Sequence, residues 1–488
     1  MQRGQSDAVI HYKMYIDGQW VESEGGGRMD AVNPATGRVF ATVPEGTRED
    51  ARRAIAAARQ AAETFAKWSP WERSRLCHTI ATVMERRRDE LARTLAEDQG
   101  KPYHTEARYE VDKAIEGFYH AAEQIKWLET SFIPVENPHK RVFTFRQPRG
   151  VYAVITPWNY PINIPVEYLA PGIATGNTIV WVPAPSTSVC AVKLMECLEE
   201  AGVPPGVVNL VTGQGPVVGD EIVAHPGTDA VGFTGSSETG VAIAARAAGK
   251  PLLLEMGGNG PVIILDDADL DLACQVAAAG SFANAGQICS SSERILVHAR
   301  VYDQVAERLV KAAEKVRLGD PFAEETTMGP LNNEKVAAKV VRHVQDSQER
   351  GAQVVFGGKV REDLGSPLFH EPTVIIDVPA DSLINREETF GPVAPLIRAK
   401  DDEEILRLAN GGRYGLTCGV FTRDIKRAFH FAENIKSGIV NINDGSTYWE
   451  LHIPFGGASG KRSGIGRLGG KYTMMEMTDL KTVTIDLR

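Results

Sequence analysis

One cysteine of the chain has surroundings suited to a nucleophile. Cys289 stands between a Gly-Gln pair and three serines in GQICSSSERILVH, residues 286–298. A catalytic thiol needs surroundings that stabilise thiolate and leave room for a carbonyl carbon, and Gly286, Ser290 and Ser291 are small enough to leave that room. The segment fits a packed loop cysteine equally well, because buried cysteine commonly behaves as a small hydrophobic residue. On this segment alone, the packed cysteine is favoured.

Glu255 is a candidate general base. It ends the apolar run PLLLE and precedes two glycines. A carboxylate in apolar surroundings has a raised pKa, which suits proton abstraction near neutral pH. The alternative is a strand-end acid that accepts backbone amides.

Asn159 is a candidate oxyanion donor. It lies in ITPWNYPINIP, residues 155–165, where two prolines fix the path of the turn. A side-chain amide beside a thiol stabilises a tetrahedral oxyanion by roughly 2.7–4 kcal/mol. The alternative is an Asx-turn, which is a common use of asparagine next to proline.

A glycine-rich turn offers a phosphate site. In GFTGSSETG, Gly235, Ser236 and Gly240 follow an expected strand and open an expected helix. Backbone N–H groups at such a helix start bind phosphate. The pattern is not GxGxxG, so taken alone it is weak support for a dinucleotide.

The elements that carry these residues follow an α/β pattern. Apolar residues at helical spacing predict helices over 49–68, 71–101 and 106–128. After residue 150, short Val- and Ile-rich runs alternate with helical stretches, which predicts parallel sheets with buried faces. Ligands of such sheets bind at the carboxyl ends of the strands, where the candidate residues fall. Further expected elements are helices over 188–202 and 301–321 and a C-terminal strand over 482–488, whose partner is a distant segment or another subunit.

Bulk composition excludes several classes of protein. The chain has 488 residues, enough for two or three domains, and its net charge of -10 disfavours a nucleic-acid partner. It has no run near the roughly 18 apolar residues of a membrane span and no apolar secretory core at its start. The 6 cysteines form no CxxC pair, so we expect no metal site, no disulfide framework and a cytoplasmic location.

Six segments together resemble the aldehyde dehydrogenase superfamily. They are TPWNYP, FTGSSETG, LEMGGNGP, GQICSSSERILVH, EETFGPV and IPFGGASGKRSGIGR, in the family's order and at similar spacing. The resemblance implies a Rossmann-like cofactor domain (1–128 and 148–258), a catalytic α/β domain (259–467) and a small bridging β element (129–147 and 468–488). It also implies a homodimer or homotetramer.

The resemblance assigns chemistry to the candidate residues. It makes Cys289 the nucleophile on an aldehyde, with Asn159 and the Cys289 N–H on the oxyanion. Hydride transfer to the nicotinamide leaves a thioester, and Glu255 activates the water that releases a carboxylic acid. The implied cofactor residues are Thr156, Pro157, Trp158, Val182, Ser186, Gly215, Phe233, Gly235, Ser236, Gly240, Glu388 (on the nicotinamide ribose) and Phe390. The implied substrate-pocket residues are Tyr160, Asn163, Glu167, Ile288, Ser290, Trp449 and Phe455.

Two departures from the family pattern bear on specificity. Val182 and Pro185 stand where the family has a lysine and a glutamate for the adenosine ribose, so we expect NAD or NADP, with NAD slightly favoured. Glu167, near Tyr160 and Trp449, favours a cationic or hydroxylated aldehyde if it faces the substrate. An ion pair between Glu167 and a neighbouring basic residue is the preferred alternative. The absence of arginine from this segment disfavours a carboxylated semialdehyde.

Two other functions remain open on the residues alone. A thiol esterase or acyl-transferring enzyme would use Cys289 without hydride transfer, and the loss of the ribose-binding pair at Val182 and Pro185 motivates it. A structural protein that retained the fold is the second alternative, and the presence of Cys289, Glu255 and Asn159 speaks against it.

Overall fold

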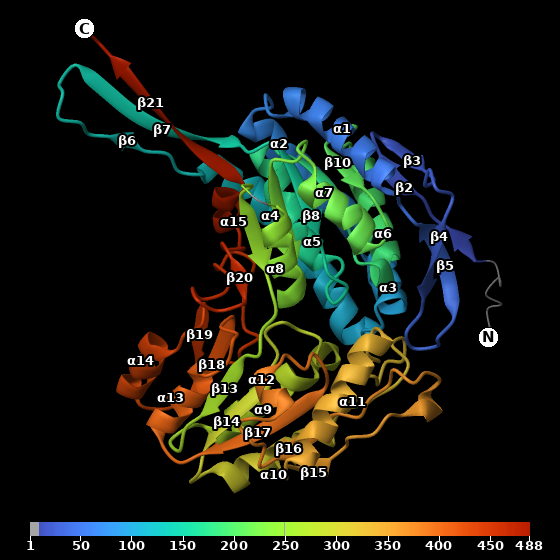
Figure 1. Ribbon diagram of the computed structural model, residues 1–488, viewed down its shortest axis with the longest axis vertical. Helices are drawn as coiled ribbons and strands as arrows, with labels where there is room; N and C mark the ends of the chain where they lie inside the picture. The colour runs from blue at the N-terminus through green and yellow to red at the C-terminus, as the bar shows by residue number, and fades with distance from the viewer. Residues whose placement is uncertain (1–8, 248) are drawn as a thin grey trace.

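The computed structural model describes residues 9–247 and 249–488, so residues 1–8 and 248 of the predicted cofactor domain lie outside the described part. The chain forms two lobes, each around its own sheet, and a β arm that projects from the first lobe (Figure 1). Strands alternate with helices through most of both lobes, so the predicted α/β fold class is confirmed.

The first lobe contains an eight-stranded sheet in the order β20-β12-β11-β8-β9-β10-β2-β3. The strands from β12 to β10 in that order run parallel, while β20, β2 and β3 are antiparallel at the edges. The strand bounds are β2 (Met14–Ile16), β3 (Gln19–Val21), β8 (Val151–Ile155), β9 (Thr178–Val182), β10 (Val208–Leu210), β11 (Ala230–Thr234), β12 (Leu252–Glu255) and β20 (Gly464–Ile465).

Helices cover both faces of this sheet. Successive residues of β8 alternate between two apolar clusters: Tyr152 and Val154 face one, and Val151 and Ala153 face the other. Both faces of the strand are therefore buried, as its nearly continuous apolar sequence predicts. The helices are α1 (Arg48–Phe65), α2 (Pro70–Arg86), α3 (Arg88–Asp98), α4 (Arg108–Gln124), α5 (Asn163–Thr175), α6 (Ser188–Glu200), α7 (Asp220–Ala224) and α8 (Ser237–Arg246).

The second lobe has a seven-stranded sheet in the order β15-β16-β17-β14-β13-β18-β19, parallel except for the β15–β16 pair. Its strands are β13 (Pro261–Ile264), β14 (Arg294–His298), β15 (Gln353–Phe356), β16 (Thr373–Ile376), β17 (Val393–Ala399), β18 (Thr417–Phe421) and β19 (Ile439–Ile442). Its helices are α9 (Leu270–Phe282), α10 (Tyr302–Ala313), α11 (Glu334–Glu349), α12 (Leu383–Arg386), α13 (Asp402–Asn410) and α14 (Ile425–Asn434).

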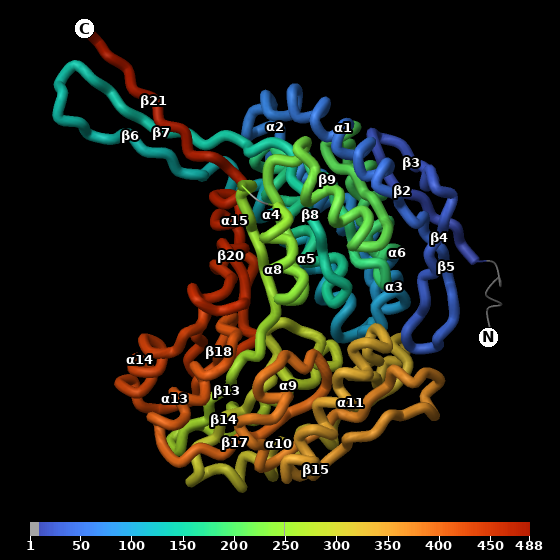
Figure 2. Tube along the Cα trace, in the orientation of Figure 1, coloured from blue at the N-terminus to red at the C-terminus, as the bar shows by residue number. Residues whose placement is uncertain are grey.

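The C-terminal strand pairs with a distant segment of its own chain. After α15 (Lys471–Glu476), β21 (Thr478–Asp486) runs antiparallel to β7 (Lys140–Pro148), which also pairs with the short β6 (Phe132–Ile133). Figure 2 shows the C-terminal segment returning from the second lobe to lie beside this hairpin. A separate small sheet near the N-terminus contains β1 (Ile10–His11), β4 (Arg28–Val32) and β5 (Val39–Pro44).

The helix predictions are confirmed in type and corrected in extent. The region 71–101 contains two helices, because Arg87 leaves the helical conformation (φ -98°, ψ 10°) between α2 and α3. The expected helix over 301–321 ends at Ala313, and residues beyond it form turns around Gly319.

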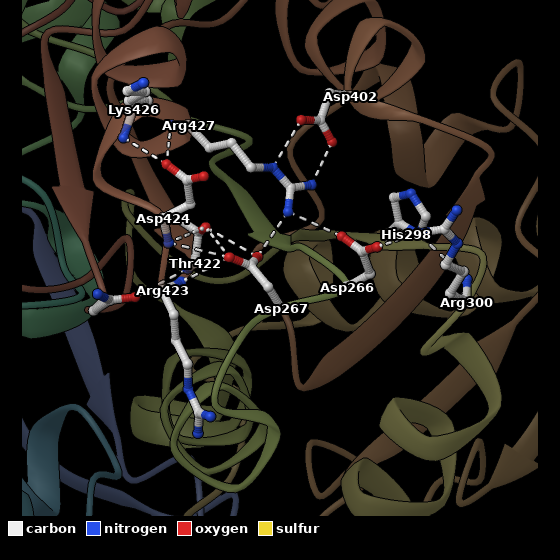
Figure 3. Close-up of polar contacts among 11 residues, drawn as sticks. Asp266, Asp267, His298, Arg300, Asp402, Thr422, Arg423, Asp424, Lys426 and Arg427 are labelled. Atoms are coloured by element: carbon white, nitrogen blue, oxygen red, sulfur yellow. Dashed lines mark hydrogen bonds and ion pairs between the residues drawn. The ribbon is translucent and has the colours of Figure 1, made fainter.

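An ion-pair network ties the segment after β13 to α13 and α14 (Figure 3). The Arg427 guanidinium donates to Asp402 at 2.6 and 2.9 Å, to Asp266 at 2.9 Å and to Asp267 at 2.8 Å. Asp267 also accepts from the Thr422 hydroxyl. One cation therefore holds three elements of the second lobe together.

None of the helices in the described ranges combines the length and apolar character needed to cross a membrane.

Candidate active site

A cavity of about 640 Å³ brings the candidate residues together. Cys289, Glu255 and Asn159 all line it, although they come from three separate segments of the chain. Further lining residues come from α4, α5, the start of α8 and the loops after residues 387 and 446. The seven predicted substrate-pocket residues also line it, namely Tyr160, Asn163, Glu167, Ile288, Ser290, Trp449 and Phe455.

A strained turn presents Cys289. Asn284, Ala285 and Gly286 have φ of 48°, 53° and 71°, so three successive residues are left-handed between α9 and the cysteine. Such a conformation is costly for Asn and Ala and persists only where its surroundings hold it. The Asn284 side-chain Nδ2 donates to the Asn159 carbonyl oxygen at 3.0 Å, and its backbone N–H donates to the Glu106 carboxylate at 2.9 Å. Those contacts join the cysteine turn to the first lobe.

The Asn159 amide points toward the cysteine loop rather than back onto its own turn. Its Nδ2 donates to the Gln287 carbonyl oxygen at 3.0 Å, across 128 positions of sequence. The Asn159 residue is 4% exposed. A donor held two residues before Cys289 has the arrangement that an oxyanion donor requires.

Two glycines after Glu255 allow neighbouring segments of the site to approach one another closely. A Cβ on Gly258 would collide with the carbonyl oxygen of Cys289, and one on Gly257 would lie 2.9 Å from a carboxylate oxygen of Glu388. Glu388 in turn accepts the Gly258 N–H at 2.9 Å. The pair thus brings the Glu255, Cys289 and Glu388 segments into contact.

Burial affects the acidity of two of the candidate groups, Cys289 and Glu255. It raises the pKa of the Cys289 thiol, and the nearby carboxyls of Glu388, Glu255 and Glu167 raise it further. Burial likewise raises the pKa of Glu255, with Glu167 adding to the effect. Neither oxygen of Glu255, at the end of β12, has a hydrogen-bond partner among the described residues. An unpartnered buried carboxyl is costly for folding, which is typical of a group kept for chemistry.

The predicted cofactor residues fall into two sets. Six line the cavity: Pro157, Trp158, Gly235, Ser236, Glu388 and Phe390. The remaining six are not among the residues that line it, namely Thr156, Val182, Ser186, Gly215, Phe233 and Gly240.

Residues of the second set lie at the carboxyl ends of β8 and β9 and in α8. Thr156 accepts the Trp181 indole N–H at 2.8 Å, and Val182 is buried at the end of β9. Gly240 packs so tightly that a Cβ would collide with the Met256 side chain. Ser236 caps α8 by accepting the Thr239 N–H, so the predicted strand-to-helix turn is confirmed.

Glu167 faces the cavity without a cationic partner among the described residues. Its Oε1 accepts from the Asn163 amide at 2.8 Å. The alternative of an ion pair with a neighbouring basic residue is therefore wrong for this structure. Burial, first, and then the nearby Glu110 raise the pKa of Glu167 to about 8.

Sequence reasoning missed a buried ion pair behind the TPWNYP loop. Lys101 Nζ donates to Glu110 at 2.5 Å and to the Asn159 carbonyl oxygen at 2.9 Å, and it lies 3.8 Å from the Tyr160 ring centre. Glu110 accepts the Ile162 N–H at 2.9 Å. In the sequence, Lys101 and Glu110 are simply charged residues within two predicted amphipathic helices. Charged residues on the solvent-exposed face of a helix give the same pattern, so the buried pair could not be recognised.

Glu293 was missed as well. It is 3% exposed and accepts the N–H groups of Thr389 at 2.7 Å and Phe390 at 2.6 Å. Phe390 is left-handed with φ of 59° and lines the cavity. Glu293 thereby holds the loop that presents Glu388. Its signal was a charged pair, Glu293 and Arg294, directly before an apolar strand.

The fold and this site define a two-lobed α/β enzyme with a cysteine thiol in its cavity, and comparison with known proteins agrees. The model of the aldehyde dehydrogenase family matches residues 20–483. A succinate-semialdehyde dehydrogenase (NADP+) of Escherichia coli is 40% identical over 98% of both chains, and a glutarate-semialdehyde dehydrogenase of Pseudomonas putida is 39% identical over the same shares. A structure of betaine aldehyde dehydrogenase from Staphylococcus aureus in complex with NAD+ matches with a TM-score of 0.94 at 36% identity, covering 98% of this chain and 95% of that one.

The chain belongs to the aldehyde dehydrogenase family. Its reaction is the oxidation of an aldehyde with NAD or NADP as cofactor.

Proposed function

We propose that Cys289, Glu255 and Asn159 carry the reaction, which produces a free carboxylic acid. The observation that supports this most is their convergence on one cavity from three distant segments. The thiolate adds to the aldehyde carbon, and the Asn159 amide with the Cys289 N–H stabilises the resulting oxyanion. Oxidation converts this adduct to a thioester on Cys289.

Formation of the thiolate needs a proton acceptor, because burial raises the pKa of the Cys289 thiol. Glu255 is a carboxyl in the same cavity without a hydrogen-bond partner in the described part of the chain. In its ionised form it takes the thiol proton in the first half of the reaction. In the second half it takes a proton from the water that attacks the thioester.

The cavity residues near α8 fit a dinucleotide. Gly235 and Ser236 line the cavity at the start of this 10-residue helix, where unpaired backbone N–H groups favour a phosphate. We assign Glu388, which also lines the cavity, to a ribose hydroxyl. NAD or NADP supplies the hydride acceptor when bound. The other predicted cofactor residues shape the sheet edge that supports it.

We propose that the enzyme prefers NAD to NADP. Val182 and Pro185 offer no charge to a 2′-phosphate. Arg48 is a nearby cation, because its guanidinium donates to the Pro216 carbonyl oxygen beside Gly215. It already forms ion pairs with Asp220 at 2.8 Å and Glu221 at 3.0 Å, so its charge is not free for a 2′-phosphate. The ratio of kcat/KM with NAD and with NADP tests this, and a ratio below one contradicts it.

The proposed substrate is an uncharged or cationic aldehyde. Carboxyl side chains from Glu110, Glu116, Glu167 and Glu450 line the cavity around and outside the cysteine. Lys113, the cation on that side, is paired with Glu116 at 2.7 Å. A carboxylated semialdehyde would bring its carboxylate among these carboxyl groups, and none of the described residues that line the cavity is an arginine. A higher kcat/KM for succinate semialdehyde than for an aliphatic or ω-amino aldehyde of equal length would contradict the assignment.

The test of the residue roles is absorbance of the reduced nicotinamide for parent and variants. Cys289→Ser should lose at least about 10³-fold in rate while it stays folded, and Glu255→Gln should lose turnover with the thiol still titratable. Reduction of NAD(P) by C289S as fast as by the parent would refute the nucleophile. Ester hydrolysis without NAD(P) reduction by any aldehyde would favour the thiol esterase.

We also propose the three-part division predicted from the sequence, with a homodimer or homotetramer formed through the arm. The sheets of the two lobes and the β21-β7-β6 sheet support the division. Exposed apolar side chains on the arm, Phe132 (67%), Leu480 (56%) and Leu487 (57%), support the association. Six unpaired cysteines agree with a cytoplasmic location. Sedimentation of the parent and of Leu480→Asp tests the interface; identical mass would contradict it.

A further inference from the structure

A second cavity adjoins the active site. It has about 30 Å³, which is enough for one or two water molecules. His120, Glu167 and Leu451 line both this cavity and the active-site cavity. A carboxyl and an imidazole therefore stand in the wall between the active-site cavity and this smaller cavity.

His120 lies between the smaller cavity and a second histidine that is partly exposed. Its Nδ1 is buried and has no hydrogen-bond partner among the described residues. Its ring lies 6.3 Å from that of His452, whose side chain is 53% exposed and stands 3.6 Å from Glu450. The groups run from Glu167 inside to His452 at the surface.

We propose that Glu167 and His120 form the exit path for the proton released when the thioester is hydrolysed. The inference rests on the proposed roles of Cys289 and Glu255. Glu255 needs such a path, because it is 2% exposed and must lose its proton before each new cycle.

The step balances as follows. A water oxygen bonds to the thioester carbon, the C–S bond breaks, and its electron pair stays on the Cys289 sulfur. The second water proton stays on the carboxylic acid that is released, and the first goes to Glu255. It passes through water in the cavity to Glu167, which gives up a proton to His120 and then to solvent.

The electrostatics of Glu167 agree with this role. Burial raises the pKa of its carboxyl to about 8, so it exchanges a proton near neutral pH. Glu110 adds to this rise, Asn163 donates to one carboxyl oxygen, and Glu167 in turn raises the pKa of Glu255. His120 is faced by His452, and Glu116 and Lys113 share its helix.

The experiment separates acylation from deacylation in Glu167→Gln and His120→Ala. Parent and variants are mixed with an aldehyde and NAD, and separately with p-nitrophenyl acetate and no cofactor. At saturating substrate, the expected result is a steady-state rate at least about ten-fold lower with both substrates, while the first-turnover burst slows much less than the steady state. Added imidazole should restore the rate of H120A several-fold, which a purely structural role would not produce.

Matched controls are Glu123→Gln, an exposed glutamate of α4, and His78→Asn on α2; both should behave like the parent. Unchanged steady-state rates in E167Q and H120A would overturn the exit path and place proton release in the main cavity. An equal loss of burst and steady state would also overturn it. A parent that turns over ester but never reduces NAD or NADP refutes the proposed function, while the ester data still decide the proton path.

Discussion

Lys101→Met removes the cation behind the TPWNYP loop and leaves its carboxylate partner buried. The side chains of Lys101 and Glu110 are 1% and 0% exposed. Removing one partner of such a pair costs about 3–5 kcal/mol, because the remaining charge is stranded. Glu110 still accepts the N–H groups of Ile162 and Asn163, so we expect the lower end, about 3 kcal/mol.

The same change should impair catalysis without abolishing it. Lys101 is one of two donors to the Asn159 carbonyl oxygen, and Asn284 remains as the other. The Asn159 amide is then displaced rather than released. A misplacement of this kind costs about 10²-fold, which we expect mainly in kcat.

The assay is urea unfolding followed by tryptophan fluorescence, combined with initial rates. The double variant Lys101→Met with Glu110→Gln should lose less than the sum of the single variants, with a coupling of about 2 kcal/mol. Lys113→Met is the control, because the Lys113–Glu116 pair is at the surface and contributes less than about 1 kcal/mol. A loss of less than about 1 kcal/mol in the free energy of unfolding of Lys101→Met would refute the stabilising role of the Lys101–Glu110 pair, as would strict additivity of the two single variants.

Three further changes test other parts of the structure. Arg427→Ala removes the cation shared by Asp266, Asp267 and Asp402, of which Asp266 keeps Arg300 and Asp267 keeps the Thr422 hydroxyl. It should lower the free energy of unfolding by about 2–3 kcal/mol in urea, with Arg427→Lys losing less; equal stability of R427A and the parent would contradict this. Burial raises the pKa of Asp98 to about 7, so the stability it contributes is fully present below about pH 4 and is lost as the pH rises through about 7. Asp98→Asn should therefore flatten the pH dependence of unfolding in that window, and an unchanged slope would count against the burial argument. Gly258→Ala puts a Cβ against the Cys289 carbonyl oxygen and should lower kcat/KM at least about 100-fold in a folded protein, whereas parental rates would show that the two loops do not need this approach.

Local sequence patterns were enough to predict most of the helices and strands. The α/β alternation, the strand that ends at Glu255 and the turn from β11 into α8 all follow from apolar periodicity and from glycine and serine placement. The break between α2 and α3 at Arg87 was not predictable, since no proline or glycine marks it. There the packing of the two helices overrides local propensity.

The chemical groups of the candidate site were predictable from the sequence, whereas the residues that hold them in position were not. Cys289, Glu255 and Asn159 were identified by residue type, local context and family motifs. The Lys101–Glu110 pair gave no distinguishing signal, because a charged residue on a helical pattern is usually solvated. Its role depends on burial, which only the packing of α4 against α5 reveals.

The amino-acid sequence by itself determined the order of strands and helices, the thiol, carboxyl and amide available for chemistry, and the family. Tertiary structure alone decided that the Asn159 amide meets Gln287, that β21 pairs with β7, and that Glu167 and His120 share a wall between two cavities. The physical reason is one of range. Spacing along the chain sets backbone conformation within a few residues, whereas contacts between distant segments depend on how the whole apolar surface is buried.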